Sequence, residues 1–370
     1  MGPKVKSYSG PDHFRWRLVL SVLSSQPISI KSIRVDEESP GLTSAEASFV
    51  KLLDQLTNGS HVEINEIGTA LFFRPGILIG GSLRHDCGSA DGQGRAVGWY
   101  IEGLLPLACF AKSPVRILFE NCITNDDMDP SVDMIRDVML PLVRQFGVGA
   151  DEESQSQLFV NVKARGARPK GGGVVDFSCP IARTLRTIDL CDAGLVRKVR
   201  GTAYSTKLSP QVPNRMVHAA RATLNHLLPD VFIFTDVYSG KTSGASPGFA
   251  VMLTASTTTG CTISAEATAE TAALPEDVAQ RAVSHLLEEV WDGGCIDSTH
   301  QSIALTLMAL GPEDVSRIRT GNLTESAMGT LRLLRDFFGV VFKVRSDPEN
   351  ETVSLSCLGS GFKNAARRVT

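Results

Sequence analysis

Amphipathic segments recur four times along the chain, and each is followed by two short segments rich in apolar residues, of which 61–66 alternates between apolar and polar positions. In the first copy, Thr43 and Glu46 form a capping-box sequence, and apolar residues then follow at the spacing of one helix face. Each copy therefore predicts a helix followed by two strands. Pro141 is expected to kink the second helix. The predicted helices and strand pairs are 43–56 with 61–66 and 70–73, 135–146 with 158–162 and 174–177, 216–228 with 231–237 and 249–253, and 323–338 with 340–344 and 353–357.

A helix packed on one strand pair cannot enclose a hydrophobic core by itself, so the copies are expected to pack side by side. This organisation predicts an α+β fold in which helices cover one face of each sheet. The third copy is followed by a segment rich in Thr, Ser and Ala at 255–273, which we expect to be an exposed connection. We therefore expect a large domain formed by residues 1–184 and 275–370, with a smaller α/β domain inserted at 185–274.

Composition narrows the class of protein. The 370 residues are 42% hydrophobic and 21% charged, as in soluble globular proteins. The longest apolar runs fall far short of the ~20 residues of a membrane span, so no membrane partner is expected. None of the eight cysteines belongs to a Cys-x-x-Cys pair. Neither a metal site nor a disulfide framework is therefore expected, and the chain is expected to act inside the cell.

Positive charge is concentrated in one part of the chain. The net charge is −3, yet nine lysines and arginines occur with only three aspartates between Lys163 and Arg200. A local surplus of this kind suits contact with RNA phosphates. A solvated charged surface would give the same sequence pattern, so the surplus alone leaves both interpretations open.

A glycine-rich sequence, Arg-Gly-Ala-Arg-Pro-Lys-Gly-Gly-Gly-Val-Val, runs from Arg165 to Val175. Consecutive glycines permit positive φ angles, and their N–H groups can form a concave nest for an anion. The alternative is a tight connection between two strands. For the anion site, the expected phosphate ligands are Arg165, Arg168, Lys170 and the backbone of Gly171, Gly172 and Gly173, with Arg74 and Arg200 as further candidates.

This glycine-rich sequence resembles the signature of the RNA 3'-terminal phosphate cyclase superfamily throughout its length. Segments 73–76 with 80–81, 98–106 and 199–204 resemble other parts of that family, so the resemblance covers nearly the whole chain. It implies a large domain of three repeated units, each with helices and a four-stranded sheet, and a smaller inserted α/β domain.

Two departures indicate a branch of the superfamily that lacks cyclase activity. Segment 10–17 reads Gly-Pro-Asp-His-Phe-Arg-Trp-Arg, where cyclases resemble one another in an acidic, glycine-rich run. Segment 319–332 contains no histidine, although cyclases carry in this region the histidine that accepts AMP. Segments 294–301 and 359–362 also resemble the non-catalytic, cyclase-like branch.

The resemblance to that branch implies a role in ribosome biogenesis. Its members belong to the small-subunit processome and support early cleavages of pre-ribosomal RNA that lead to 18S rRNA. The implied protein is a scaffold in the nucleus and nucleolus, without cyclase activity and without a cofactor. The implied partners are a nucleolar ribosome-biogenesis GTPase, pre-ribosomal RNA and other processome proteins.

An enzyme is the alternative, either a residual cyclase or an endonuclease that cleaves pre-ribosomal RNA. His300 could replace the missing nucleophile, although its position also fits a helix start capped by Asp297 or Ser298. Arg335 and Asp336 could position a phosphate and a water molecule for cleavage. Phosphodiester cleavage needs an acid–base pair or a metal held by carboxylates, and the sequence contains no convincing set of either kind.

Overall fold

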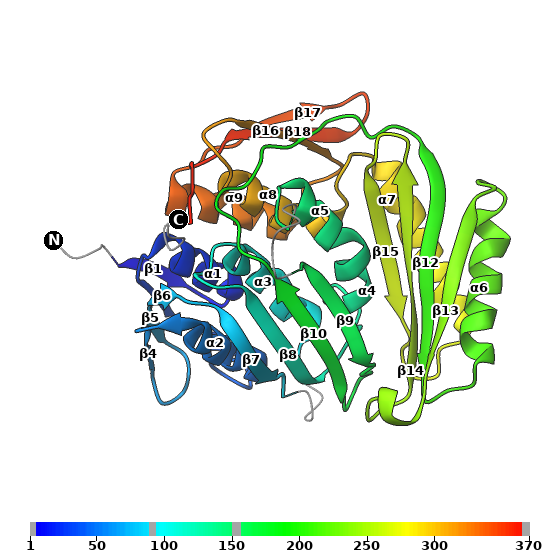
Figure 1. The fold of residues 1–370 in the computed structure, drawn as a ribbon, viewed down its shortest axis with the longest axis horizontal. Helices are drawn as coiled ribbons and strands as arrows, with labels where there is room; N and C mark the ends of the chain where they lie inside the picture. The colour runs from blue at the N-terminus through cyan, green and yellow to red at the C-terminus, as the bar shows by residue number, and fades with distance from the viewer. Residues whose placement is uncertain (1–4, 89–93, 150–156, 365–370) are drawn as a thin grey trace.

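The structure is a computed structural model that describes residues 5–88, 94–149 and 157–364. Helices and strands are mixed throughout the described chain, which confirms the α+β class (Figure 1). The helical elements are α1 (Phe14–Ser24), α2 (Ser44–Leu56), α3 (Val97–Cys109), α4 (Val132–Met134), the π-helical η2 (Ile135–Met139), α5 (Leu140–Gln145), α6 (Gln211–Leu224), the 3₁₀ turn η3 (Gly240–Thr242), α7 (Pro275–Asp292), the 3₁₀ turn η4 (Ser298–His300), α8 (Gln301–Ala309) and α9 (Glu325–Phe338).

Three four-stranded sheets of the larger part share one topology. In each, the first two strands of the sequence pair in parallel, and the fourth and then the third add antiparallel. The orders are β1 (Lys6–Ser9), β2 (Ile28–Lys31), β5 (Leu71–Arg74), β4 (His61–Ile64); β7 (Gly81–Asp86), β8 (Val115–Cys122), β10 (Gly173–Cys179), β9 (Phe159–Ala164); and β11 (Asp189–Leu190), β16 (Val315–Thr320), β18 (Thr352–Leu358), β17 (Lys343–Asp347). A short ladder joins β3 (Thr57–Asn58) to β6 (Ile77–Leu78).

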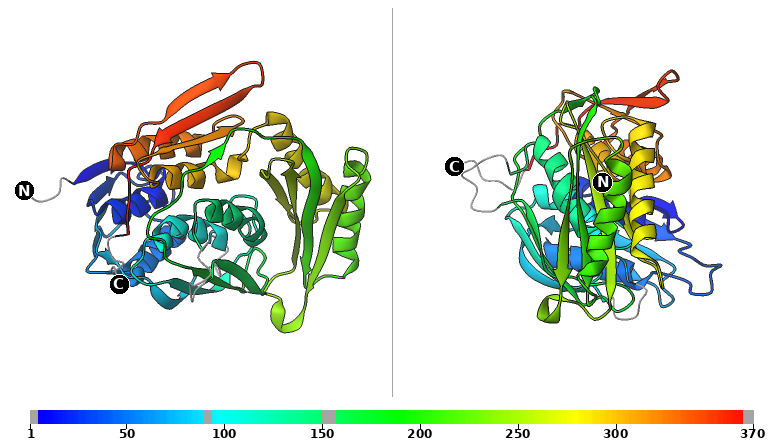
Figure 2. Two further views of the ribbon diagram at one scale, coloured as in Figure 1. Left: turned by 45° about the horizontal axis from the view of Figure 1, so that its top comes forward. Right: turned by 90° about the vertical axis from the view of Figure 1, so that its right-hand side faces the viewer.

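The fourth sheet has a different strand order and a core of its own. Its order is β13 (Val231–Tyr238), β12 (Val196–Thr206), β14 (Gly248–Thr257), β15 (Thr262–Thr268), and α6 and α7 lie on the same side of it (Figure 2). Segment 255–273, expected as an exposed connection, instead supplies the end of β14 and all of β15. Helix α7 was expected in the large domain, but its apolar face packs into this second core, which therefore extends beyond residue 274.

Local sequence explains where several of these helices begin and end. Thr43 caps α2, and its hydroxyl and the Glu46 carboxylate form the predicted capping box. The second predicted helix is divided into α4, η2 and α5. Pro141 lies at the start of α5, directly after the π-helical turn, because proline has no N–H to donate to the preceding turn.

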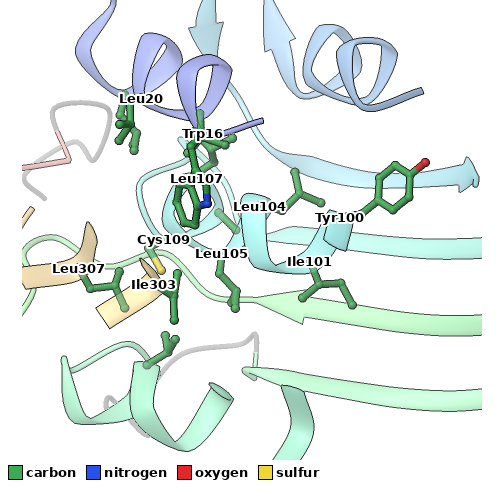
Figure 3. Packing of buried hydrophobic residues seen from close by; sticks show 14 of the residues in the cluster. Trp16, Leu20, Tyr100, Ile101, Leu104, Leu105, Leu107, Cys109, Ile303 and Leu307 are labelled. Atoms are coloured by element: carbon green, nitrogen blue, oxygen red, sulfur yellow. The ribbon is translucent and has the colours of Figure 1, made fainter. Parts of the chain in front are cut away.

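Helix α3 is the centre of the larger hydrophobic core. All 13 of its residues are buried, so it is covered on every side rather than along one stripe, and its one charged residue, Glu102, is paired with Arg15. Figure 3 shows side chains of α1 and α8, including Trp16 and Ile303, packed around Leu104 and Leu105 of α3. The three sheets and the outer helices enclose this core. The starts of several helices and the loops beside them lie outside the core and line a cleft.

Candidate functional site

A cleft of about 1040 Å³ lies between the helices of the larger part and the inserted sheet. One wall is formed by the starts of α1, α2 and α9 and by the loop from Asp126 to Pro130, and the other by β15 and α7. The N-caps of α2 and α9, Thr43 and Thr324, both lie on the wall. Helix N-termini favour negative charge, so the cleft has the backbone geometry of an anion site.

The side chains that line the cleft, in contrast to the helix N-termini, disfavour an anion. Among the described residues that line it, acidic groups outnumber arginines, and no lysine is present. This surplus of negative charge disfavours the phosphates of ATP or RNA. The acidic residues are Glu46, Glu102, Asp126, Asp127, Asp129, Glu266, Glu288, Glu289 and Asp292, and the arginines are Arg15, Arg34, Arg95 and Arg281. Of the acidic residues, Glu266 is mostly neutral at pH 7 because its pKa is raised to about 8.

Each of these arginines is already paired with a carboxylate. In three of the four pairs the carboxylate is buried, so a phosphate would have to displace a buried acidic partner, which opposes binding. Only the fourth pair, with Glu270, lies at the surface. The pairs are Arg15 with Glu102, Arg34 with Glu46 (2.7 Å), Arg95 with Asp129 (Nε–Oδ2 2.8 Å) and Arg281 with Glu270 (3.1 Å).

Two histidines that the sequence analysis did not single out, His13 and His285, line the cleft. His13 precedes α1 with a φ of 51°, and its ring packs so closely on α9 that a Cβ at Gly329 would lie 1.8 Å from Nε2. Burial and then the charge of Arg17 lower the pKa of His13, which favours a neutral ring at pH 7. His285 is exposed on α7.

His300 lies beneath the cleft wall and not on it. Its side chain is 1% exposed, and Nδ1 lies 2.5 Å from Oδ1 of Asp297. Asp297 caps η4 by accepting the backbone N–H of His300, which confirms the helix-start interpretation. Asp297 also accepts the hydroxyl of Ser264 on β15 at 2.6 Å. His300 is thus part of a buried contact between the two parts of the molecule, and its burial does not support the alternative in which it replaces the missing nucleophile.

Arg165 is also buried, which corrects the expectation that it contacts phosphate. Its side chain has no exposed area, and both terminal nitrogens donate to Asp133 of α4, at 2.6 and 2.7 Å. Asn125 accepts a further bond at 3.0 Å. The guanidinium lies 4.3 Å from the ring centre of Tyr204 on β12 and 5.2 Å from that of Tyr238 on β13. Arg165 therefore connects the second unit to the inserted sheet.

The glycines make the backbone contact at the same junction. Gly171 and Gly172 have the predicted positive φ angles, 58° and 82°. The N–H of Gly171 donates to Ala167 within the turn, and its carbonyl accepts the N–H of Ala245 from the inserted part at 2.9 Å. A Cβ on Gly172 would lie 2.8 Å from the Ala245 nitrogen, and Gly173 already begins β10. The geometry favours the tight connection over the anion nest.

Two basic side chains of the glycine-rich sequence lie at the outside of the junction. Arg168 is partly exposed, with Nε 2.9 Å from Asp126 and Nη2 2.9 Å from the carbonyl of Gly94. Lys170 is exposed, and its backbone N–H donates to Ser246 at 3.2 Å. Lys170 is the more accessible candidate for a phosphate contact.

The remaining candidate cations lie on separate surfaces. Arg74 is exposed on β5 of the first sheet. Arg200 lies in the first half of β12 with Asp230 at 2.8 Å, six residues from Thr206 at the junction end of that strand. Six residues of strand span about 20 Å. The structure therefore does not gather Arg74, Arg200 and the glycine-rich sequence into one site.

Arg335 and Asp336 lie near the C-terminal end of α9, whose opposite end borders the cleft. Both side chains are exposed, and the Arg335 Nε lies 3.8 Å from the Asp336 carboxylate. About 15 Å of helix separates Asp336 from Ser326 on the cleft wall. Across the described ranges, no group of three or more His, Cys, Asp or Glu residues is placed to hold a metal ion. In those ranges, too, no helix has the length and hydrophobicity needed to cross a bilayer.

A family model and individual relatives both connect this chain with RNA 3'-terminal phosphate cyclases and cyclase-like proteins. Residues 6–344 match the model of the family described as RNA 3'-terminal phosphate cyclase. An RNA 3'-terminal phosphate cyclase-like protein of Homo sapiens is 45% identical, covering 98% of this chain and 97% of its own length. A protein of Schizosaccharomyces pombe, named as an rRNA processing protein, is 39% identical over 99% of both chains.

The buried position of Arg165 generates a stability prediction. Replacing it by methionine (Arg165→Met) removes the bidentate partner of the buried Asp133 carboxylate and leaves only Arg136, at 3.1 Å, to balance its charge, so we expect a loss of about 3–5 kcal/mol in the free energy of unfolding. Urea denaturation followed by circular dichroism measures this loss. Lys170→Ala is the matched control, with an expected change within about 0.5 kcal/mol. Equal, small losses in the two variants would contradict the assignment.

Glu266 of β15 generates a pH prediction. Its Oε1 accepts the N–H of Ser131 at 2.8 Å, while Oε2 is buried without a hydrogen-bond partner among the described residues. Burial raises the pKa of Glu266 to about 8, with a further contribution from Asp133 and Asp127. The folded protein thus retains a proton that the unfolded chain releases above pH 4.5, so stability falls as pH rises from about 4.5 to 8.

Glu266→Gln removes this titration and keeps an oxygen acceptor for Ser131. We expect the variant to exceed the parent protein in stability by about 1–3 kcal/mol at pH 8 and to match it near pH 4. Urea denaturation at pH 4, 6 and 8 provides the comparison, with exposed Glu288→Gln as control. A difference that is constant with pH would show that Glu266 is not protonated in the folded protein.

Proposed function

This chain belongs to the RNA 3'-terminal phosphate cyclase family, and from that premise we propose that it is an rRNA processing factor without cyclase activity. In this proposal it acts in the nucleus and nucleolus, within the small-subunit processome. It supports the early cleavages of pre-ribosomal RNA that lead to 18S rRNA. Its contribution is to hold a nucleolar GTPase and pre-ribosomal RNA in place.

The electrostatics of the cleft carry the proposal. An enzyme that accepts AMP from ATP needs free positive charge beside the triphosphate and an accessible nucleophile. Here every arginine of the cleft is neutralised by a carboxylate, and acidic groups remain in surplus. A family fold whose cleft disfavours nucleotide is better suited to scaffolding than to transfer of AMP.

The names of the relatives also support a role in rRNA processing. The Schizosaccharomyces pombe relative is named for rRNA processing, and several others are named as cyclase-like. For the RNA contact, exposed Lys170 and the partly exposed Arg168 remain the candidates of the glycine-rich sequence. Arg165 leaves that set because its guanidinium has no exposed area.

Incubation with ATP labelled on the adenine moiety tests the absence of nucleotidyl transfer. We expect no covalent AMP adduct under conditions in which a true cyclase of the same family becomes labelled. If label is incorporated, peptide mapping and the variants His13→Asn, His285→Asn and His300→Asn identify the acceptor. An adduct on any of these imidazoles would overturn the scaffold proposal.

Depletion of the protein from its own cells tests the processing role. We expect loss of 18S rRNA and accumulation of uncleaved precursor in pulse-labelled RNA, while the large-subunit rRNA is maintained. A chain carrying Asp336→Ala should restore 18S rRNA as fully as the parent chain, because a scaffold needs no cleavage chemistry there. Unchanged 18S rRNA after depletion would refute the proposal.

The endonuclease alternative predicts a different result for the same variant. Purified protein would then cleave a precursor fragment, and Asp336→Ala would abolish cleavage. The carbonyl of Asp336 that accepts the Lys6 ammonium at 2.6 Å belongs to the backbone, so the variant preserves that contact. Cleavage that depends on Asp336 would therefore support an enzyme and not a change in packing.

A further inference from the structure

Two phenylalanines are exposed side by side on the inserted sheet. Phe232 and Phe234 of β13 are 51% and 56% exposed, and their ring centres lie 4.6 Å apart at an interplanar angle of 74°. The alternate residues of the strand, Val231 and Ile233, point into the core beneath α6 and α7 and are each 6% exposed. The pair therefore lies on the face of the sheet opposite α6 and α7, which we call the open face. Figure 2 shows these two helices on one side of the sheet.

Packing within the chain does not explain this pair. On a sheet with one face covered, the solvent-facing positions of a strand are normally polar. Exposed aromatic neighbours on such a face mark a surface that contacts something else. At the junction end of the same face, the aromatic residues Tyr204 and Tyr238 are covered by the guanidinium of Arg165. Phe232 and Phe234 have no such cover from the described part of the chain.

Basic side chains accompany the exposed pair. In the parallel register of β12 and β13, Arg200 lies opposite Phe232, and Lys198 is two residues earlier on the same face of β12. The partner of Arg200, Asp230, is itself exposed. Surface ion pairs of this kind contribute little, so a phosphate can replace the carboxylate at small cost.

A groove continues from the pair toward the second unit. It measures about 390 Å³, with Thr202, Met252 and Thr254 on its floor and Arg200 and Phe234 on one side. The other side is formed by η2 and α5, through Arg136, Asp137 and Pro141. Arg136 is partly exposed and is paired with Asp137 at 2.8 Å and with the buried Asp133 at 3.1 Å. With Lys198 and the exposed Arg197 near Asp230, four cations accompany three carboxylates around this face, Asp137, Asp230 and Asp236.

We propose that this open face, formed by Lys198, Arg200, Phe232, Phe234 and the adjoining groove, binds single-stranded RNA. Bases stack on the two phenylalanine rings, and the connecting phosphates lie against Arg200, Lys198 and Arg136. A flat sheet with aromatic and basic side chains suits unpaired bases, whose faces are free to stack. A duplex buries those faces and cannot use the rings. The inference rests on the proposed function and locates its RNA contact away from the cleft.

Fluorescence anisotropy with labelled 12-nucleotide oligo(U) and oligo(A), and with a 12-base-pair RNA duplex, tests the proposal. The full chain should bind both single strands more tightly than the duplex. The double variant Phe232→Ala/Phe234→Ala should weaken single-strand binding at least about tenfold. Exposed Trp291→Ala, on α7 and away from the open face, is the matched control and should leave binding unchanged.

Two further variants separate stacking from charge. Phe234→Trp should retain the affinity, and the new indole should be quenched on addition of RNA. Lys198→Ala and Arg200→Ala should each reduce the slope of log affinity against log salt concentration by about 0.7. All these side chains are at least partly exposed, and unchanged urea midpoints would show that the fold is intact.

The outcomes distinguish this inference from the proposed function. If the parent chain binds single strands and the double phenylalanine variant binds equally well, the location is wrong while RNA binding stands. If the parent chain binds no RNA, the RNA contact of the proposed function fails as well. If the double variant keeps RNA but loses a processome protein, the open face is a protein-docking surface and the proposal is overturned.

Discussion

The buried ion pair between Arg165 and Asp133 is the contact on which the arrangement of the two parts depends. A fully enclosed guanidinium is tolerated only when its charge is matched, and here a bidentate carboxylate and two tyrosine rings provide that environment. The glycines beside it allow backbone to approach backbone. The signature of the family therefore functions in this chain as the junction between the second unit and the inserted sheet.

The junction also determines the width of the cleft, because the two walls of the cleft belong to the two parts that the junction holds together. The walls come from α1, α2 and α9 on one side and from β15 and α7 on the other, so their separation depends on how the inserted sheet is held. Glu266 and Asp297 add further bonds across the same boundary. The helix N-termini still lie at the cleft, but the paired arginines and surplus carboxylates that line it disfavour an anion there. Basic charge is instead distributed over outer surfaces, around Lys170 and around Arg200.

Much of the fold could be predicted from the spacing of apolar residues and from the residues that begin and end helices. The capping box at Thr43, the helix at 323–338 and the α+β class depend on contacts within a few residues, which the sequence displays directly. The segment at 255–273 was misinterpreted because its small polar residues resemble a loop. Its strand forms only through pairing with β14, and residues 275–292 were assigned to the large domain because only this sheet reveals where the apolar face of α7 packs.

The sequence by itself determined the repeated units, the family and the identity of the charged residues. Only the tertiary structure decided which charges are accessible, since the partners of Arg165 and of the cleft arginines are distant in the chain. The sequence shows that a residue is basic, but it does not show whether the side chain is buried in an ion pair or exposed to water. The exposure of Phe232 and Phe234 was hidden for a related reason: alternation in a strand indicates two faces, and only the position of α6 and α7 decides which face is covered.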